Sequence, residues 1–317
     1  MGPLEATNRT AGFDGPFSAQ PFTRTSMPRH RLPIIGYPLA RTASEAVMEA
    51  ALRASGSPIQ IERWERKPHQ LGDAIEELNG DDFAGALIAA PHKEKAAALA
   101  DSLSDQAKVS GAVNLLLEEK GRLRGHNSDV PAMRAGLEAI LPRVQGNWPR
   151  QAVILGAGGA ARAVVAVLLG SGFQRIVVFN RHLHRAEALV AHFARSARHM
   201  ELRAMPWHEA IMESELSRVP LIVNASGIGV QEGDSPIPAD LLPANGFLLD
   251  LVLDTTPLMR QMQERGGAVA NGQLSFLHSS AEAFGLLTGT DAPEDVMRQA
   301  LAEELGIPEE RVAVVGD

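Results

Sequence analysis

Short apolar runs, each followed by a stretch with helical spacing, recur along the chain from residue 32 onwards. Apolar runs of about four to eight residues are typical of buried strands, and apolar positions three or four apart are typical of helices. The predicted strands are residues 32–36, 59–64, 85–90, 113–117, 123–127, 153–155, 176–179, 220–224 and 247–252. The predicted helices are residues 43–55, 71–78, 92–100, 129–140, 160–169, 185–194, 258–264, 275–287 and 293–305, with Ser128 and Asp129 as the expected cap of the helix at 129–140. Because strands and helices alternate in both halves, we expect an α/β fold with parallel sheets and right-handed crossovers. The strands at 113–117 and 123–127 are expected to form a hairpin.

A glycine-rich turn connects one of these strands to the helix that follows. In the sequence VILGAGGAAR (residues 153–162), Gly156, Gly158 and Ala161 have the G-x-G-x-x-A spacing of dinucleotide-binding turns. The glycines allow a tight turn and close approach to a pyrophosphate, and the free N–H groups of the helix start attract its phosphates. The cofactor-binding residues expected in this turn are Gly156, Ala157, Gly158, Gly159 and Ala160.

The end of the next strand indicates which dinucleotide is bound. NAD-binding folds carry an acidic residue near this point for the ribose 2′-hydroxyl, and none is present here. The chain has Asn180 and Arg181 instead, with Arg185 one helical turn later. Guanidinium groups chelate phosphate oxygens, so these residues favour the 2′-phosphate of NADP. Solvated charges at a helix start would give the same sequence, which leaves NAD open.

A stretch with two prolines and a glycine, residues 142–150 (PRVQGNWPR), predicts a boundary between two domains. The expected organisation is a mobile extension over 1–30, a first α/β domain over 31–130, a connecting helix and linker over 131–150, a Rossmann-type NAD(P)-binding domain over 151–272, and C-terminal helices over 273–317 that pack back toward the first domain.

The composition is that of a globular protein, with 45% hydrophobic and 21% charged residues among 317. The net charge of −8 argues against a nucleic-acid-binding or anionic membrane surface. The chain has no cysteine, which excludes disulfides, thiolate catalysis and thiolate metal sites. The N-terminal residues lack the apolar segment of a signal peptide. We therefore expect a cytoplasmic monomer or homodimer whose partner is a small molecule.

Several short motifs lie between about residues 32 and 287. They are residues 35–40 (IGYPLA), 91–94 (PHKE), 111–114 (GAVN), 125–129 (GHNSD), 156–162 (GAGGAAR), 180–181 (NR), 223–226 (VNAS) and 256–258 (TPL). In combination they resemble the shikimate/quinate dehydrogenase family. The resemblance implies an N-terminal substrate domain, a C-terminal NAD(P) domain, an active site in the cleft between them, and hydride transfer between a ring carbinol and nicotinamide.

The family's catalytic lysine falls on Lys93 and its partner aspartate on Asp129. Oxidation of an alcohol needs a base within hydrogen-bond reach of the hydroxyl group. A lysine is mostly charged at neutral pH, so the resemblance implies that Asp129 orients Lys93 and shares the proton. Without the flanking motifs, the two residues would be ordinary helix-start charges.

Other family positions imply contacts to the substrate and to the rest of the cofactor. Thr42 and Ser44 match hydroxyl residues on the substrate carboxylate, although helix capping explains them as well. Asn114 matches an asparagine that hydrogen-bonds ring hydroxyls. The further cofactor-binding residues expected are Ala225, Ser226, Leu251 and Gly272.

Several substrate positions depart from the family pattern. Where the family reads N-V-T-x-P-x-K, residues 87–93 read LIAAPHK, so Leu87 replaces an asparagine and Ala89 a substrate-binding threonine. Leu253 stands for a tyrosine that touches substrate, and Ser279 for a glutamine. A site that loses polar partners discriminates against the matching ligand hydroxyls. We therefore expect retained redox chemistry on a different, less hydroxylated cyclic acid, with Ala89, Leu253 and Ser279 still at the substrate.

Other functions remain open at this point. The chain could be a genuine shikimate or quinate dehydrogenase of aromatic amino-acid synthesis, or a catalytically weak, nucleotide-binding regulatory paralogue. The ten histidines show no convincing zinc-ligand spacing, so no metal site is expected. A serine hydrolase would need a G-x-S-x-G turn, which the sequence around Ser226 does not have.

Overall fold

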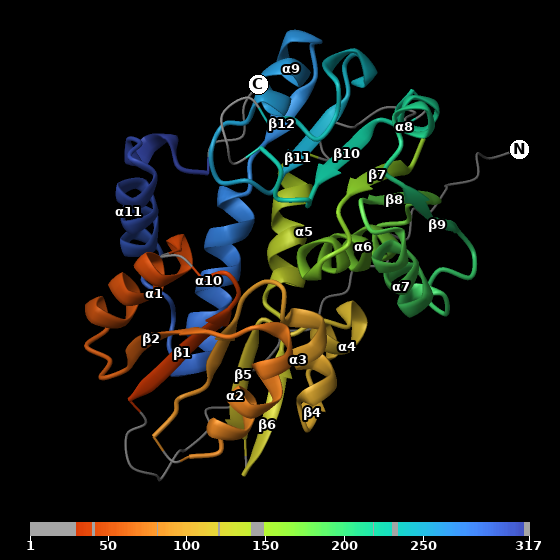
Figure 1. The fold of residues 1–317 in the computed structure, drawn as a ribbon. Helices are drawn as coiled ribbons and strands as arrows, with labels where there is room; N and C mark the ends of the chain where they lie inside the picture. The colour runs from red at the N-terminus through yellow and green to blue at the C-terminus, as the bar shows by residue number, and fades with distance from the viewer. Residues whose placement is uncertain are drawn as a thin grey trace, which may run out of the picture.

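The computed structural model describes residues 30–39, 42–80, 82–119, 121–140, 149–217, 219–229 and 234–313. The expected N-terminal extension, apart from its last residue, and most of the expected linker lie outside these ranges. The described chain forms two α/β domains, each with one six-stranded sheet. Helices α5 (Asp129–Ile140) and α10 (Gln273–Thr288) pack against each other between the two sheets (Figure 1). A Cβ atom on Gly136 would collide with Ser275, so the glycine lets these two helices approach closely.

The first sheet has the strand order β2-β1-β3-β5-β6-β4. Its strands are β1 (Arg31–Gly36), β2 (Gln60–Glu65), β3 (Ala86–Ile88), β4 (Ser102–Leu103), β5 (Leu115–Glu119) and β6 (Arg122–His126). Its helices are α1 (Ala43–Ala54), the 3-10 helix η1 (Pro68–Gln70), α2 (Leu71–Glu77), α3 (Lys93–Leu99) and α4 (Asp105–Ser110). The expectation of a parallel sheet holds only in part for this domain. β1 runs parallel to β2 and β3, and β4 to β6, but β5 runs antiparallel to β3 and β6, and β5 and β6 form the predicted hairpin. The tight β5–β6 hairpin reverses the chain, with Gly121 at a positive φ of 78°.

The second sheet is parallel throughout, with the order β12-β11-β10-β7-β8-β9. Its strands are β7 (Gln151–Leu155), β8 (Arg175–Asn180), β9 (Glu201–Pro206), β10 (Leu221–Asn224), β11 (Phe247–Asp250) and β12 (Ala268–Ala270). Its helices are α6 (Gly159–Gly170), α7 (Leu183–Phe193), α8 (Glu209–Leu216), the 3-10 helix η3 (Ala239–Leu241) and α9 (Pro257–Glu264). The strand order reverses between β7 and β10, and ligands of such sheets bind beyond the carboxyl ends of the strands at this point. The predicted α/β class with a Rossmann-type second domain is confirmed.

Helix α6 is apolar almost all round because it is buried almost all round. Its residues from Ala161 to Leu168 are buried between the second sheet and α5. Ala161 is fully buried, as expected for a residue that keeps this helix close to its strand. The packing of α6 on α5 fixes the position of the glycine-rich turn at the start of α6 relative to Asp129 at the start of α5.

The C-terminal helix α11 (Glu294–Leu305) packs on α1 rather than on the second sheet, as the left side of Figure 1 shows. Val47 and Met48 of α1, Phe284 of α10 and Leu301 of α11 share one apolar core. The short 3-10 helix η4 (Glu309–Arg311) follows. The last described residues therefore support the helix at whose N-terminus Thr42 lies.

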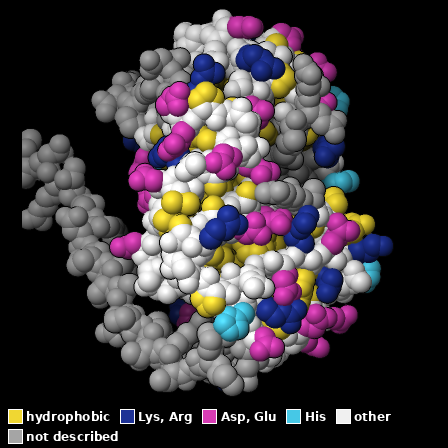
Figure 2. All heavy atoms as spheres, turned by 90° about the vertical axis from the view of Figure 1, so that its left-hand side faces the viewer, with side chains coloured by type: hydrophobic (Ala, Val, Ile, Leu, Met, Phe, Trp, Pro, Cys, Tyr) yellow, Lys and Arg dark blue, Asp and Glu magenta, His cyan; other side chains and the backbone are white. Residues whose placement is uncertain are grey.

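The described part of the chain contains no helix that combines the length and apolar character needed to cross a membrane. On the face drawn in Figure 2, basic and acidic side chains are interspersed rather than gathered into a single-sign patch. The cytoplasmic location, the oligomeric state and the exact domain limits stay predictions.

Candidate active site

A cavity of about 620 Å³ lies between the two domains. Elements of the first domain, with α5 and α10, form one wall, and the glycine-rich turn with the ends of β8, β10 and β11 forms the other. All site residues expected from the sequence line this one cavity. They are Lys93, Asp129, Thr42, Ser44, Asn114, Ala89, Leu253, Ser279, Gly156, Ala157, Gly158, Gly159, Ala160, Asn180, Arg181, Arg185, Ala225, Ser226, Leu251 and Gly272.

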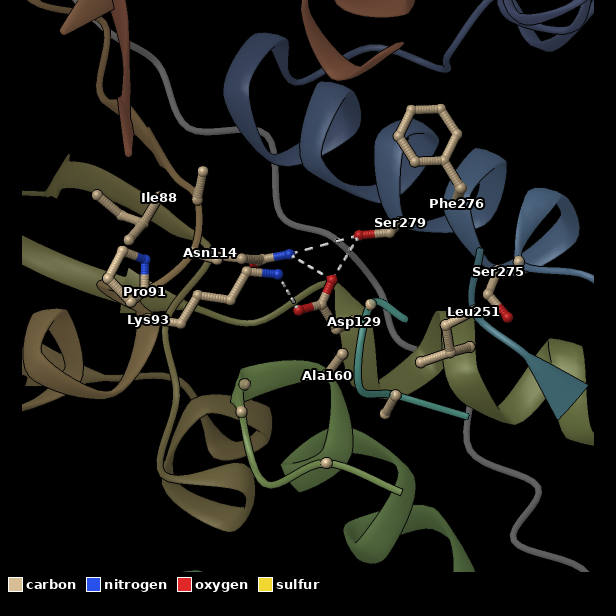
Figure 3. Close-up of a pocket in the computed structure, with 18 of the residues that line it drawn as sticks. Ile88, Pro91, Lys93, Asn114, Asp129, Ala160, Leu251, Ser275, Phe276 and Ser279 are labelled. Atoms are coloured by element: carbon tan, nitrogen blue, oxygen red, sulfur yellow. Dashed lines mark hydrogen bonds and ion pairs between the residues drawn. The ribbon is translucent and has the colours of Figure 1, made fainter. Parts of the chain in front are cut away.

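Lys93 and Asp129 meet inside this cavity. The Nζ atom of Lys93 lies 2.6 Å from Oδ2 of Asp129, and Figure 3 shows the two side chains pointing toward each other from different elements. Lys93 is the first residue of α3 and Asp129 the first of α5. A carboxylate at a helix N-terminus is stabilised by the helix dipole, so Asp129 suits an ionised partner for the lysine. The pair is partly shielded from solvent, with side-chain exposures of 22% for Lys93 and 10% for Asp129.

The second oxygen of Asp129 is held by two further side chains (Figure 3). Its Oδ1 accepts hydrogen bonds from Asn114 Nδ2 at 3.0 Å and from Ser279 Oγ at 3.1 Å. Ser128 completes the group, with its hydroxyl 2.8 Å from both Asn114 Nδ2 and Ser279 Oγ. These bonds fix the carboxylate so that its other oxygen faces Lys93.

The N-terminus of α5 is capped by a residue other than the expected one. We expected Ser128 and Asp129 to cap this helix, but Oδ1 of Asn127 accepts the hydrogen bond from Val130 N, at 3.0 Å. The Asn127 amide also donates to Ala112 O at 2.8 Å, which ties the helix start to the loop before β5. Because Asn127 takes the capping role, Ser128 and Asp129 are free to face the cavity.

Thr42 and Ser44 lie where α1 begins, at the edge of the cavity. The Thr42 hydroxyl accepts a hydrogen bond from Glu45 N at 3.4 Å, so Thr42 is the N-cap of α1. This outcome matches the capping explanation for Thr42, whereas Ser44 lies inside the first turn of α1. The substrate role of both hydroxyls stays a proposal. A helix N-terminus that opens into a cavity is nevertheless a favourable place for a carboxylate.

The glycine-rich turn has the conformation that a dinucleotide needs. Gly156 has a positive φ of 107°, and a Cβ atom there would lie 2.5 Å from Ala225 O. Gly158 is the N-cap of α6 and offers no side chain, which leaves the first N–H groups of the helix to an anion. A Cβ atom on Gly159 would lie 2.7 Å from Cδ of Lys93, so this glycine also makes room for the lysine. The residues present therefore fit a pyrophosphate.

Arg181 and Arg185 follow β8, on the same side of the cavity as the turn. The Asn180 amide donates to His182 O at 2.9 Å and shapes the loop between strand and helix. Arg181 is exposed, whereas Arg185 is half-buried and lies 3.6 Å from a carboxylate oxygen of Glu94 in the first domain. Both guanidinium groups border the cavity next to the turn, which fits a cofactor with a 2′-phosphate.

A buried network that sequence reasoning did not assign orders the loops after β10 and β11. Oδ1 of Asp250 accepts from Asn224 Nδ2 at 2.9 Å, and its Oδ2 accepts from Thr256 Oγ1 at 2.8 Å. Asn224 also accepts from Ser226 Oγ at 2.6 Å. Burial raises the pKa of Asp250 to about 6, and the hydrogen bonds from Thr256, Val252 and Asn224 partly oppose that rise. The network fixes Ser226 at the cavity wall.

The end of the cavity near α1 and α10 is mostly apolar. Its apolar lining residues are Ile34, Met48, Leu87, Ala89, Leu253, Phe276 and Ala283. Leu87, Leu253 and Phe276 are partly exposed in the cavity and pack on the core shared by α1, α10 and α11. Figure 3 places Phe276 on the same helix as Ser279. Leu87, Ala89 and Leu253, three of the positions that depart from the family pattern, thus lie in this apolar part of the lining, whereas Ser279 belongs to the polar group around Asp129.

The sequence carried signals for residues that were not assigned a role. Glu94 directly follows Lys93 in the motif PHKE, and Ser128 directly precedes Asp129 in the motif GHNSD. Asn224 and Thr256 also stand in motifs of the resemblance, and Asp250 begins the late-strand segment whose tyrosine position is Leu253. Their contacts join segments far apart in the chain, which spacing alone does not reveal.

Comparisons with known proteins agree with this geometry. The profile of the shikimate dehydrogenase substrate binding domain matches residues 34–116, and that of shikimate / quinate 5-dehydrogenase matches residues 141–224. A shikimate dehydrogenase (NADP(+)) from Symbiobacterium thermophilum is 34% identical over 278 residues, which cover 86% of this chain and 94% of the relative. The chain belongs to the shikimate/quinate dehydrogenase family.

Solved structures of the family superpose on most of the chain. Shikimate 5-dehydrogenase from Thermus thermophilus, in complex with NADP(H) and shikimate, has a TM-score of 0.70 at 33% identity and covers 86% of this chain and 99% of its own. Quinate dehydrogenase from Corynebacterium glutamicum, in complex with NAD, has a TM-score of 0.72 at 26% identity, with coverages of 86% and 99%. The predicted family, two-domain architecture and oxidoreductase class are confirmed.

Proposed function

We propose that this protein is an NADP-dependent dehydrogenase that interconverts a ring alcohol and the corresponding ketone in a cyclic hydroxy acid less hydroxylated than shikimate. The observation that carries the proposal is the Lys93–Asp129 pair, which opens into the cavity beside the glycine-rich turn. The pair and the turn come from different domains, so their meeting defines a place where a cofactor and a substrate can react.

Lys93 is the proposed proton-transfer residue. In the reducing direction, its ammonium donates a proton to the carbonyl oxygen of the substrate, and Asp129 holds the ammonium in place. In the oxidising direction, Lys93 takes up the hydroxyl proton, with Asp129 as the neighbour that stabilises the charge formed. Asn114 and Ser279 keep Asp129 oriented through both directions. Bound NADP supplies the redox chemistry, because its nicotinamide accepts or gives the hydride.

NADP is the cofactor that the chain's own residues and its relatives favour. Arg181 and Arg185 border the cavity, and the strand before them ends without a carboxylate that would repel a 2′-phosphate. The relative from Symbiobacterium thermophilum is an NADP(+) enzyme, and the Thermus thermophilus structure contains NADP(H).

The proposed substrate has a carboxylate and an apolar body. Thr42, Ser44 and the N-terminus of α1 would receive the carboxylate, and the reacting oxygen would lie at Lys93. Leu87, Ala89 and Leu253 offer no hydrogen bond to further ring hydroxyls, and burying an unpaired hydroxyl against them costs about 1–3 kcal/mol. Such a wall favours a ring that has lost hydroxyl groups on the side facing α1.

The second candidate is a genuine shikimate or quinate dehydrogenase, which the relatives' names support. Restoring the family residues tests between the two. The variant Leu87→Asn, Ala89→Thr, Leu253→Tyr should raise kcat/KM for shikimate by about 10–1000-fold, because each added group pairs with a ligand hydroxyl. If the unmodified chain already turns shikimate over faster than the restored variant does, the altered-substrate proposal is wrong.

A further inference from the structure

Glu94, the residue after Lys93, faces two arginines of the other domain. One carboxylate oxygen lies 3.6 Å from a guanidinium nitrogen of Arg185, and the other lies 3.9 Å from Nε of Arg162. Glu94 stands in the first turn of α3, and the two arginines lie in the first turns of α7 and α6. The contact therefore joins the element that carries Lys93 to the elements that flank the glycine-rich turn.

Arg162 has an incomplete set of partners for a buried cation. It is 7% exposed, and its Nε atom makes no hydrogen bond to any residue that the structure describes. One of its terminal nitrogens donates to Ser110 O at a long 3.4 Å. Burial lowers the pKa of this guanidinium, whereas the charge of Glu94 raises it. A buried cation in this position needs a nearby opposite charge, and Glu94 supplies one from across the cleft.

The same side of α3 touches the turn directly. The aliphatic chain of Lys93 occupies the space that a Cβ atom on Gly159 would take, so there is little room between α3 and the turn. A force that draws Glu94 toward Arg162 and Arg185 also presses Lys93 against the turn, because Lys93 and Glu94 are adjacent in the chain.

We propose that Glu94 is a positioning residue with two effects. It holds the two domains together, and its negative charge lowers the affinity of the protein for NADP. This inference rests on the proposed cofactor function. The carboxylate of Glu94 attracts Arg162 and Arg185 and so holds Lys93 at the cofactor. It also neutralises part of the positive charge that Arg185 would offer to a 2′-phosphate. NAD has no such phosphate, so its binding is insensitive to the charge of Glu94.

The variant Glu94→Gln tests both consequences, because it keeps the shape of the side chain and removes its charge. We expect NADP to bind about 3–10-fold more tightly, as measured by its dissociation constant, while that for NAD stays unchanged. The radius of gyration from small-angle X-ray scattering should shift to a larger value, because the unbalanced charge of Arg162 favours separated domains. Glu94→Asp, which keeps the charge, should restore the NADP/NAD affinity ratio toward that of the unmodified chain.

Two controls make the outcome decisive. Glu76→Gln is the same substitution on the exposed side of α2. It should change neither the NADP dissociation constant nor the radius of gyration. In an Arg185→Ala background, Glu94→Gln should no longer alter NADP affinity. Equal weakening of NADP and NAD in Glu94→Gln, or an unchanged NADP affinity with an unchanged radius of gyration, would overturn the proposal. If Arg185→Ala and Arg181→Ala both leave NADP binding intact, the cofactor assignment fails instead, and the scattering shift alone decides whether Glu94 closes the domains.

Discussion

At the scale of single residues, the proposed proton transfer depends first on Lys93. Replacing it with methionine keeps the aliphatic chain that lies against Gly159 and removes the ammonium. We expect kcat to fall by about 10²–10⁴-fold, because no other group replaces its proton transfer. The NADP dissociation constant should stay within about threefold of its original value, since the proposed contact of the Lys93 ammonium is with the reacting oxygen and not with the phosphates.

Lys95→Met is the matched control for this prediction. Lys95 stands on the same helix, but its Nζ donates to Pro68 O on the exposed side. Turnover that survives in Lys93→Met, as in this control, would show that the proton comes from elsewhere.

The cofactor preference is also decided by single side chains. Arg181→Ala should weaken NADP binding by about 10–100-fold, the usual loss of a charge-assisted bond to phosphate, and leave NAD binding nearly unchanged. Titration of nicotinamide fluorescence measures both affinities. Arg195→Ala, an exposed arginine after α7, is the control. Intact NADP affinity in Arg181→Ala would remove this residue from the 2′-phosphate site.

At the scale of elements, Asp250 joins the ends of β10 and β11 to the start of α9 and makes stability depend on pH. Its folded-state pKa of about 6 lies above its ordinary value of 3.8. An acid with a raised pKa contributes stability below its ordinary pKa and loses that contribution as the pH rises through the folded-state value. Asp250→Asn keeps the shape and one of the two acceptor oxygens, and its side chain does not titrate, so it has no such loss. Its unfolding free energy relative to the unmodified chain should therefore rise by on the order of 2–3 kcal/mol between pH 4 and pH 7.

Urea unfolding at both pH values measures this difference. Asp254→Asn, on the exposed part of the same loop, should show no comparable change. A constant difference between Asp250→Asn and the unmodified chain across the pH range would show that Asp250 is not held in its protonated form.

Most elements could be predicted from the sequence because their residues are buried in a regular pattern. The buried strands at 153–155, 176–179 and 220–224 and the apolar helix α6 were predictable for this reason. The strands β4, β9 and β12 and the helices α4 and α8 were not predicted. Edge strand β9 has only partly buried or exposed residues, and β4 and β12 are two and three residues long, so their patterns carry little signal.

At the site, too, the sequence predicted some features and missed others. The glycine-rich turn and Lys93 belong to local motifs, so the sequence predicted which residues would come together. It did not reveal that Asn127 caps α5, that Glu94 reaches across to Arg185, or that Asn224 and Asp250 are bonded. Only the Glu94–Arg185 contact depends on how the two domains pack. The Asn224–Asp250 bond depends on the pairing of β10 with β11, and the Asn127 cap is one of several local choices that neighbouring polar residues offer.

At the scale of the whole molecule, the C-terminal helix stabilises the substrate side of the cleft. Leu301 of α11 is fully buried in the apolar core that α11 shares with α1 and α10. Leu301→Ala should lower the unfolding free energy by about 2–5 kcal/mol through the cavity it leaves. Thermal unfolding measures the loss. Leu286→Ala, where the side chain is 37% exposed, should cost much less. Equal effects of the two substitutions would contradict the packing of α11 on α1.

The most direct test of the central claim is reduction of NADP⁺, followed by absorbance, with a panel of cyclic hydroxy acids that includes shikimate, quinate and less hydroxylated ring acids. We predict that a less hydroxylated acid is oxidised with a higher kcat/KM than shikimate, that NADP⁺ is preferred to NAD⁺, and that Lys93→Met lowers kcat by about 10²–10⁴-fold. Faster turnover of shikimate than of every other acid would contradict the proposed preference for a less hydroxylated substrate. Tight binding of NADP without turnover of any acid would contradict the proposed dehydrogenase activity and favour a nucleotide-binding regulatory role.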